Sequence, residues 1–375
     1  MELQSVWGWQ PALYLFLGGM GAGAFITAAV LYLKDKERHA LIVCVSMWAA
    51  AISLIVGLLL LLMELVTPAR GLLMWQSFSH FTSWMTYGAW GAFAAIIVFG
   101  ISALLATPPL KGWLSARWTW FKVHECGIRS VLSGIGIALG AFVAFYTGML
   151  LMASESVPFW NTLLLPALFT VSAFDTGVAL VEVTAVLLAK KEQISLDAKR
   201  LLERCVVVLV LVEAVVLAAF LGSMLSADTA SPTGSAAVAS ATMFVSGQLA
   251  VWFWALVAVV GLALPLCMAL RGLLGKGAGD EVSDLGESKP LAGDAASDVA
   301  AVVGGGNELD DSSLEEVCTT LQEGEADAKR KPPMDVATLV GAAGALVGGC
   351  ALRFLVLAAG IHADVVAETI FKMIN

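Results

Sequence analysis

Residues 146–180, YTGMLLMASESVPFWNTLLLPALFTVSAFDTGVAL, are the most informative part of this chain. The segment ends one apolar helix, crosses a short polar loop and begins a second apolar helix, which is the pattern of a membrane hairpin. Polar and aromatic residues gather where the two helices are predicted to meet the membrane surface: Tyr146, Ser154, Glu155, Trp160 and Asn161. Asp175 follows inside the second helix, where a charge is costly, so we expect a functional reason for its position.

The composition is that of an integral membrane protein. The 375 residues are 59% hydrophobic and only 14% charged. A segment of about 20 apolar residues crosses a hydrocarbon core of about 30 Å. Eight segments reach that length: 12–33, 40–66, 84–106, 129–153, 163–189, 204–226, 243–270 and 336–360. We therefore predict an all-α polytopic protein of eight transmembrane helices, with the lipid bilayer as its surroundings, in the cytoplasmic (inner) membrane of the cell.

Lysine and arginine are concentrated in alternate loops of this predicted topology. They follow the first span, lie between the third and fourth and between the fifth and sixth, and follow the seventh, whereas the other loops carry little beyond Arg70. Basic loops stay on the cytoplasmic side of a membrane. Both termini are therefore expected outside. No Lys or Arg precedes the first span, so we expect it to remain in the mature protein rather than to act as a cleaved signal.

One segment, 275–335, differs in texture from the rest of the sequence. It is rich in Gly, Asp, Glu, Ser and Ala and has no aromatic residue. Residues 271–335 hold 15 of the 30 acids and 6 of the 21 bases, so they account for the whole net charge of −9. Such a composition does not bury enough apolar surface to offset the entropy of ordering. We expect an acidic, largely disordered cytoplasmic insertion, either a solvated spacer or a docking segment, and no nucleic-acid partner.

The cysteines and histidines indicate no metal centre in this protein. The six cysteines are scattered singly without a C-x-x-C pair, so an iron–sulfur cluster bound by this chain is not expected. The histidines are His39, His80, His124 and His362, all at predicted helix ends or in loops. A haem between helices takes two axial ligands at one depth, so a bis-histidine b-type haem stays open as an alternative.

Ionisable residues inside the predicted spans suggest a path across the membrane. They are Glu64, Asp175, Glu182, Glu213 and Arg353. At about 1.5 Å per residue, Glu64 and Arg353 reach the outer third, Asp175 and Glu213 fall near mid-depth, and Glu182 lies closer to the inner surface. Intramembrane charges face the bundle interior and either pair with each other or line a route for protons or polar ligands. The purely structural alternative is that Arg353 neutralises one of the acids.

Five motifs resemble a known family over nearly the whole sequence apart from the acidic insertion. They are YLFLGGMGAGAF at 14–25, MELVTPARGLLMWQSF at 63–78, SWMTYGAWG at 83–91, the segment at 146–180, and LRFLVLAAG at 352–360. Together they are similar to the NrfD-type membrane subunits, the polysulfide reductase membrane-anchor family. The glycines of the first motif allow close approach of either another helix or a flat ligand.

The resemblance implies a fold and a function. The fold is two four-helix bundles, the first at 1–158 and the second formed by 159–274 with 336–375. The function is a membrane subunit of a respiratory oxidoreductase that oxidises quinol, or reduces quinone, near the outer face. The implied cofactor is a quinone of the menaquinone type. The implied partner is a ferredoxin-like iron–sulfur subunit, which serves a molybdopterin or multihaem catalytic subunit. Such membrane subunits typically hold no redox metal themselves.

The resemblance also implies roles for individual residues. Tyr146 of the YTG motif matches the tyrosine that the family places at the quinone head group. Glu64, with Pro68 and Arg70, fits the family's acid-x-x-x-Pro-x-Arg pattern, in which the acid is more often Asp. His80 is added on chemical grounds, because a head group needs a proton partner and histidine titrates in the useful range.

Two other classes of protein share some of these features. A secondary transporter also buries acids at mid-depth, but it predicts helix breaks at matching places in two halves, and Pro166 and Pro265 are not so paired. A b-haem membrane anchor would need the histidine pairs described above. The sequence leaves the direction of electron flow and the terminal substrate open.

Overall fold

The computed structural model describes residues 7–36, 38–64, 84–154, 156–274 and 336–363. Over the described residues the protein is 85% helix and has no strand. Eight of these helices are long and apolar enough to cross a membrane. The prediction of an all-α polytopic protein with eight transmembrane helices is confirmed. The location of the termini and the division into two four-helix bundles stay predictions, and the acidic insertion at 275–335 lies outside the described residues.

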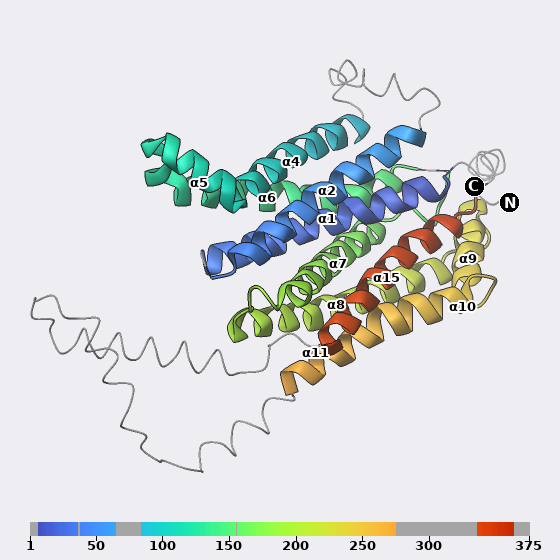
Figure 1. The fold of residues 1–375 in the computed structure, drawn as a ribbon. Helices are drawn as coiled ribbons and strands as arrows, with labels where there is room; N and C mark the ends of the chain where they lie inside the picture. Colours follow the sequence, from blue (N-terminus) through green and yellow to red (C-terminus); the bar gives the residue numbers. More distant parts are fainter. Residues whose placement is uncertain (1–6, 37, 65–83, 155, 275–335, 364–375) are drawn as a thin grey trace, which may run out of the picture. The chain divides into compact units, whose positions relative to one another are not determined.

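Two helices, α1 and α7, occupy the centre of the helical unit (Figure 1). Both pack against α6 and α15 and against each other, while α4 packs on α2 and α6. The bounds are α1 Trp9–Lys34, α2 Ala40–Glu64, α4 Trp84–Ala106, α6 Thr119–Met152, α7 Leu164–Leu188, α8 Leu196–Leu225 and α15 Val336–Ala358. Large apolar side chains such as Leu59, Phe93 and Val215 are exposed on the surrounding helices, as expected for surfaces that face lipid.

Glycines set how closely the two central helices approach. A Cβ on Gly23 of α1 would collide with the backbone of Ala173 in α7, and a Cβ on Gly177 of α7 would collide with the backbone of Gly23. The backbones are therefore in direct contact there, which only residues without a side chain permit. Of the two readings of the α1 glycine motif, close helix packing is the one that the structure supports at Gly23.

The seventh span differs from the prediction of 243–270. Helix α9 (Pro232–Val245) is a separate element, and the helix breaks at Ser246 and Gly247, whose N–H groups both donate to the carbonyl of Thr242. The span then runs through α10 (Ala250–Trp252), the π-helical segment η2 (Phe253–Ala263) and α11 (Leu264–Leu274). Hydropathy alone did not register this break, because the residues around it are apolar on both sides.

Two predicted boundaries at the basic loops are also corrected. The segment between the third and fourth spans is helical rather than a loop, because it forms α5 (Pro108–Arg117) before α6 begins at Thr119. Helix α8 begins at Leu196, eight residues before the predicted span start at Arg204. Charged residues in both places extend the helices past the apolar run, since helices continue beyond the hydrocarbon core when caps and ion pairs satisfy their ends.

The two ends of the unit are chemically distinct. We call the end where α1 and α7 terminate the basic end, because Lys34, Lys190, Lys191 and Lys199 lie there. The opposite end, where α6 and α15 terminate, is called the Tyr146 end. Helix α1 begins at the same end at which α15 terminates (Figure 1). By the positive-inside rule the basic end is predicted to be cytoplasmic.

Candidate functional site

The YTG motif places three consecutive residues of α6 against three different helices. The Tyr146 ring lies against Gly88 of α4, and Thr147 faces α1, where a Cβ on Gly18 would come 3.8 Å from its Cγ2. A Cβ on Gly148 would collide with Pro166 at the start of α7. The motif therefore fixes the end of α6 within the bundle, and it fixes the direction of the Tyr146 side chain at the same time.

Tyr146 is held in a hollow that glycines of α4 create. A Cβ on Gly88 would overlap the Tyr146 phenol, and one on Gly91 would overlap the ring of Phe142. The Phe142 and Tyr146 rings stack with centroids 6.1 Å apart and an interplanar angle of 15°. This contact explains why the SWMTYGAWG segment carries its glycines three residues apart, since that spacing puts both on one face of α4.

The Tyr146 hydroxyl is buried without a hydrogen-bond partner among the described residues. The side chain is only 7% exposed, and Tyr14 of α1, itself buried, is a neighbour that acts on it electrostatically. A buried phenol normally finds a partner, because leaving its O–H unpaired costs free energy. The arrangement therefore offers a hydrogen-bond donor to a ligand or water at the Tyr146 end.

Two of the predicted head-group residues lie outside what the structure describes. Glu64 is the last residue of α2, but its side chain is outside the described residues. His80 belongs to residues 65–83, which are outside them as well. Their proposed approach to Tyr146 therefore stays a prediction. Tyr14 and Gly88 were missed by sequence reasoning, although both lie in motifs that it quoted.

Arg353 of α15 is fully buried, at 0% exposure, against α7. Its Nη1 donates to the Ser172 hydroxyl and to the carbonyl of Gly349, each at 2.7 Å, and its Nη2 donates to the Phe169 carbonyl at 3.3 Å. The guanidinium carbon also lies 5.2 Å from the centroid of the Phe169 ring. Among the described residues Arg353 forms no ion pair, so it does not neutralise an acid by direct contact.

Two acids lie close to this arginine without touching it. Asp175 of α7 and Glu213 of α8 are 2% and 4% exposed, and both interact electrostatically with Arg353 and with each other. The Oδ1 atom of Asp175 has no hydrogen-bond partner among the described residues. A buried carboxyl with an unpaired oxygen either carries a proton or awaits a water or ligand. The predicted grouping of these three side chains is therefore present.

A second group of charges continues toward the basic end. Glu182 of α7 is buried and interacts electrostatically with Asp175 on one side and with Glu203 and Lys199 of α8 on the other. Lys199 and Glu203 form a buried ion pair with an Nζ to Oε1 distance of 3.4 Å. Glu182 and Glu203 both line a cavity of about 20 Å³, which is large enough for one water. Sequence reasoning missed Glu203 because it assigned this turn to a loop.

Polar contacts brace the basic end. The Glu192 carboxylate accepts from the backbone N–H groups of Leu41, at 3.2 Å, and Ile42, at 2.7 Å, and thereby caps the start of α2. His39 Nε2 lies 3.1 Å from the hydroxyl of Ser195, which also caps α8. Of the four histidines, His39 therefore has a structural hydrogen bond.

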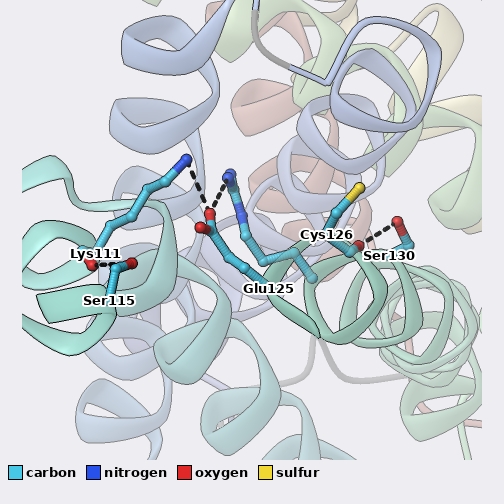
Figure 2. A network of polar contacts seen from close by, with 6 residues as sticks. Lys111, Ser115, Glu125, Cys126 and Ser130 are labelled. Atoms are coloured by element: carbon cyan, nitrogen blue, oxygen red, sulfur yellow. Dashed lines mark hydrogen bonds and ion pairs between the residues drawn. The ribbon is translucent and has the colours of Figure 1, made fainter. Parts of the chain in front are cut away.

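A second brace joins α5 to α6 at the same end. Glu125 Oε1 lies 2.9 Å from Lys111 Nζ and 3.6 Å from Arg129 Nη1, and Figure 2 shows Lys111 and Glu125 side by side. The Arg129 guanidinium carbon lies 4.3 Å from the centroid of the Tyr32 ring in α1. These contacts fix α5, α6 and α1 to one another where the polypeptide is predicted to leave the membrane. Among the described residues no group of His, Cys, Asp and Glu has the arrangement of a metal site.

The fold and this site define a multi-pass integral membrane protein with buried ionisable side chains. Comparison with known proteins adds its family: the family described as "Polysulphide reductase, NrfD" matches residues 1–276. The C subunit of polysulfide reductase from Wolinella succinogenes is 30% identical over 284 residues, which cover 70% of this protein and 82% of that subunit. Protein NrfD of Escherichia coli K12 is 27% identical over 283 residues, covering 70% and 84%.

The chain belongs to the NrfD polysulphide reductase family, as its motifs indicated. This membership is consistent with a membrane anchor of a respiratory oxidoreductase. The relatives are membrane subunits of multi-subunit complexes. The family match ends at residue 276, so Arg353 and its helix α15 lie beyond the matched range.

Proposed function

We propose that this chain is the quinone-reactive membrane subunit of a respiratory oxidoreductase. In this proposal a quinol is oxidised, or a quinone reduced, at the Tyr146 end, and two electrons pass to an iron–sulfur subunit docked there. The observation that carries the proposal is the buried Tyr146 hydroxyl, seated in the hollow at Gly88 and without a hydrogen-bond partner among the described residues. Family membership supports the same assignment.

The residues present fit a quinone head group. A phenol donates one hydrogen bond, and a quinone carbonyl accepts one, so the Tyr146 hydroxyl is suited to hold the head group and to stabilise negative charge that develops on its oxygen. The neighbouring Tyr14 supplies a second buried phenol on α1. The quinone itself, of the menaquinone type, supplies the two-electron redox chemistry, while the protein supplies binding, orientation and proton handling.

Proton transfer must accompany the electron transfer. Oxidation of a quinol releases two protons, so acceptors are needed within reach of the head group. Glu64, at the end of α2, and His80, in the segment that follows, are the residues we assign to this role. We further propose a ferredoxin-like iron–sulfur subunit as the partner, which passes electrons to or from a molybdopterin or multihaem subunit.

The test is quinol-dependent turnover of the intact complex with a Tyr146→Phe variant. This change removes only the hydroxyl, so the α6 packing is kept while the proposed hydrogen bond is lost. We expect turnover to fall about tenfold or more, as the loss of one transition-state hydrogen bond of about 1.4 kcal/mol or more implies. Tyr32→Phe, which removes a buried hydroxyl at the basic end, is the matched control and should turn over normally. Unchanged turnover in Tyr146→Phe would refute the head-group assignment.

A second proposal is that turnover moves protons across the membrane. Electrostatic contacts run without interruption from Arg353 through Asp175 and Glu182 to Lys199 and Glu203 at the basic end, with Glu213 beside Asp175. Buried carboxyls at such intervals are typical of proton routes. The unpaired Asp175 Oδ1 and the water-sized cavity at Glu182 support the proposal. Proteoliposomes that turn over without generating a membrane potential would remove it.

The two competing classes are separated by purification. A complex that carries iron–sulfur and molybdenum or multihaem subunits together with this chain supports the quinone proposal. A Soret absorption band assigned to this chain would favour a b-haem anchor instead. Substrate uptake by this chain alone in vesicles would favour a transporter.

A further inference from the structure

A groove lies between α1 and α8 near the basic end. Its volume is about 390 Å³, within the range of roughly 300 to 1,000 Å³ that ligand pockets occupy. Helices α1 and α8 each pack near α7, but they do not pack against each other over any length. Side chains of α7, including Phe174 and Val178, therefore form the floor, and Ile26 and Val30 of α1 face Leu209 and Val208 of α8 across it.

The groove is open toward the surrounding lipid rather than enclosed. Val208 is 58% exposed and Val30 is 40% exposed, and both line it. The lining is almost wholly apolar, and the hydroxyl of its one threonine, Thr27, donates to the carbonyl of Gly23 in its own helix at 2.9 Å. An apolar groove open to a membrane accommodates hydrocarbon tails well, because close packing recovers dispersion contacts that an empty groove would lose.

One charge stands at this apolar groove. Among the described residues that line it, Arg204 alone is charged, and its side chain is exposed. Arg200, one turn earlier on the same face of α8, is exposed as well. Arg204 lies eight residues from the start of α8, about 12 Å along the helix, which places it where the apolar run begins. Neither arginine is part of an ion pair among the described residues.

We propose that this groove is a specific site for one anionic phospholipid. Its phosphate lies against Arg204, with Arg200 adding to the positive field, and the upper part of one acyl tail lies between α1 and α8 on Phe174 and Val178. A basic residue beside an apolar cleft between transmembrane helices on the cytoplasmic side is suited to an anionic lipid head group. An arginine facing lipid needs such an anion nearby, because a lone charge at this depth is costly.

The test is native mass spectrometry of the complex purified from its membrane in mild detergent. The wild-type complex is expected to retain one anionic phospholipid. In Arg204→Gln the occupancy should fall about fivefold, as the loss of about 1 kcal/mol for one basic residue implies. Arg204→Lys should keep most of it. Arg117→Gln removes an exposed charge at the same end but away from the groove and should match the wild type.

A second pair of variants tests the position of the acyl tail. Val208→Trp fills the groove from its exposed side and leaves both arginines in place, so it should also expel the lipid. Val215→Trp, two turns further along the same exposed face of α8, does not line the groove and should retain the lipid. Retention of the anionic lipid in Arg204→Gln or in Val208→Trp would overturn the proposal. A quinone or a neutral lipid as the retained molecule would overturn it too.

Discussion

Gly88 of α4 and Tyr146 of α6 are in such close contact that a single methyl group on Gly88 would overlap the tyrosine ring. The glycine therefore positions the phenol that we assign to the quinone head group. Because Tyr146 contacts a glycine, its ring lies against backbone, and no flexible side chain of Gly88 is present to adjust. This contact links two motifs that are separated by more than fifty residues in the sequence.

Gly88→Ala should displace the Tyr146 ring and reduce quinol-dependent turnover. Overpacking of this kind costs about 1–3 kcal/mol of stability, so the protein should still fold. Turnover and thermal stability of the purified complex are the measurements. Gly100→Ala is the control in the same helix, because nothing lies within 4 Å of the added Cβ. Equal turnover in the two variants would contradict the positioning role of Gly88.

The contact between Gly23 and Gly177 should govern the assembly of α1 and α7. Either residue changed to alanine forces the two backbones apart, which should lower the melting temperature and the yield of folded protein. Gly134→Ala in α6 adds the same methyl group where nothing lies within 4 Å and should be neutral. Melting of purified variants in detergent distinguishes the sites, and a Gly23→Ala protein as stable as Gly134→Ala would disprove the close approach.

Ser172→Ala should destabilise the protein by leaving Arg353 short of a partner. The serine hydroxyl accepts from Nη1 at 2.7 Å, and Nε already lacks a partner among the described residues. Removing one partner of a buried charged donor costs about 1–3 kcal/mol. Ser130→Ala serves as control, because that hydroxyl is exposed and only donates to the Cys126 carbonyl of its own helix. Chemical or thermal unfolding measures both variants, and equal losses would count against the role of Ser172.

His39 should make stability depend on pH. Burial lowers the pKa of His39 below its ordinary value of 6.5, with a lesser effect from Arg38, while Glu192 and Asp35 oppose the shift. The folded state therefore binds this proton less readily than the unfolded state. The resulting stability is complete above the unfolded pKa and is lost as the pH falls through the folded pKa.

The measurement for His39 is the melting temperature as a function of pH. The wild type should lose stability on going from about pH 7.5 to about pH 5.5, the range in which histidine titrates. His39→Gln has no proton to take up but can still bond with Ser195, so its profile should be flatter. Parallel profiles for the two proteins would exclude His39 as the source.

Hydropathy predicted the fold well because membrane spans depend on a property of each segment by itself. The third span was placed at 84–106, and α4 runs from Trp84 to Ala106. The errors occurred where that property is silent: at Ser246 and Gly247, where an apolar stretch breaks, and at α5 and the start of α8, where helix continues through charged residues.

The candidate site was predictable only in part, because it depends on which helix faces which. Tyr146, Asp175 and Arg353 were found because a polar residue within an apolar span stands out. The partners of these residues were not. Ser172 and Gly88 are unremarkable in sequence, and they gain their roles only because α15 and α6 pack against the faces that carry them.

The most direct test of the account is a density map of the intact complex prepared with a bound quinone. We predict the head group at the Tyr146 end, with a carbonyl oxygen within hydrogen-bond distance of the Tyr146 hydroxyl and the iron–sulfur subunit seated over the same end. A head group bound elsewhere, or an iron–sulfur subunit attached at the basic end, would contradict it.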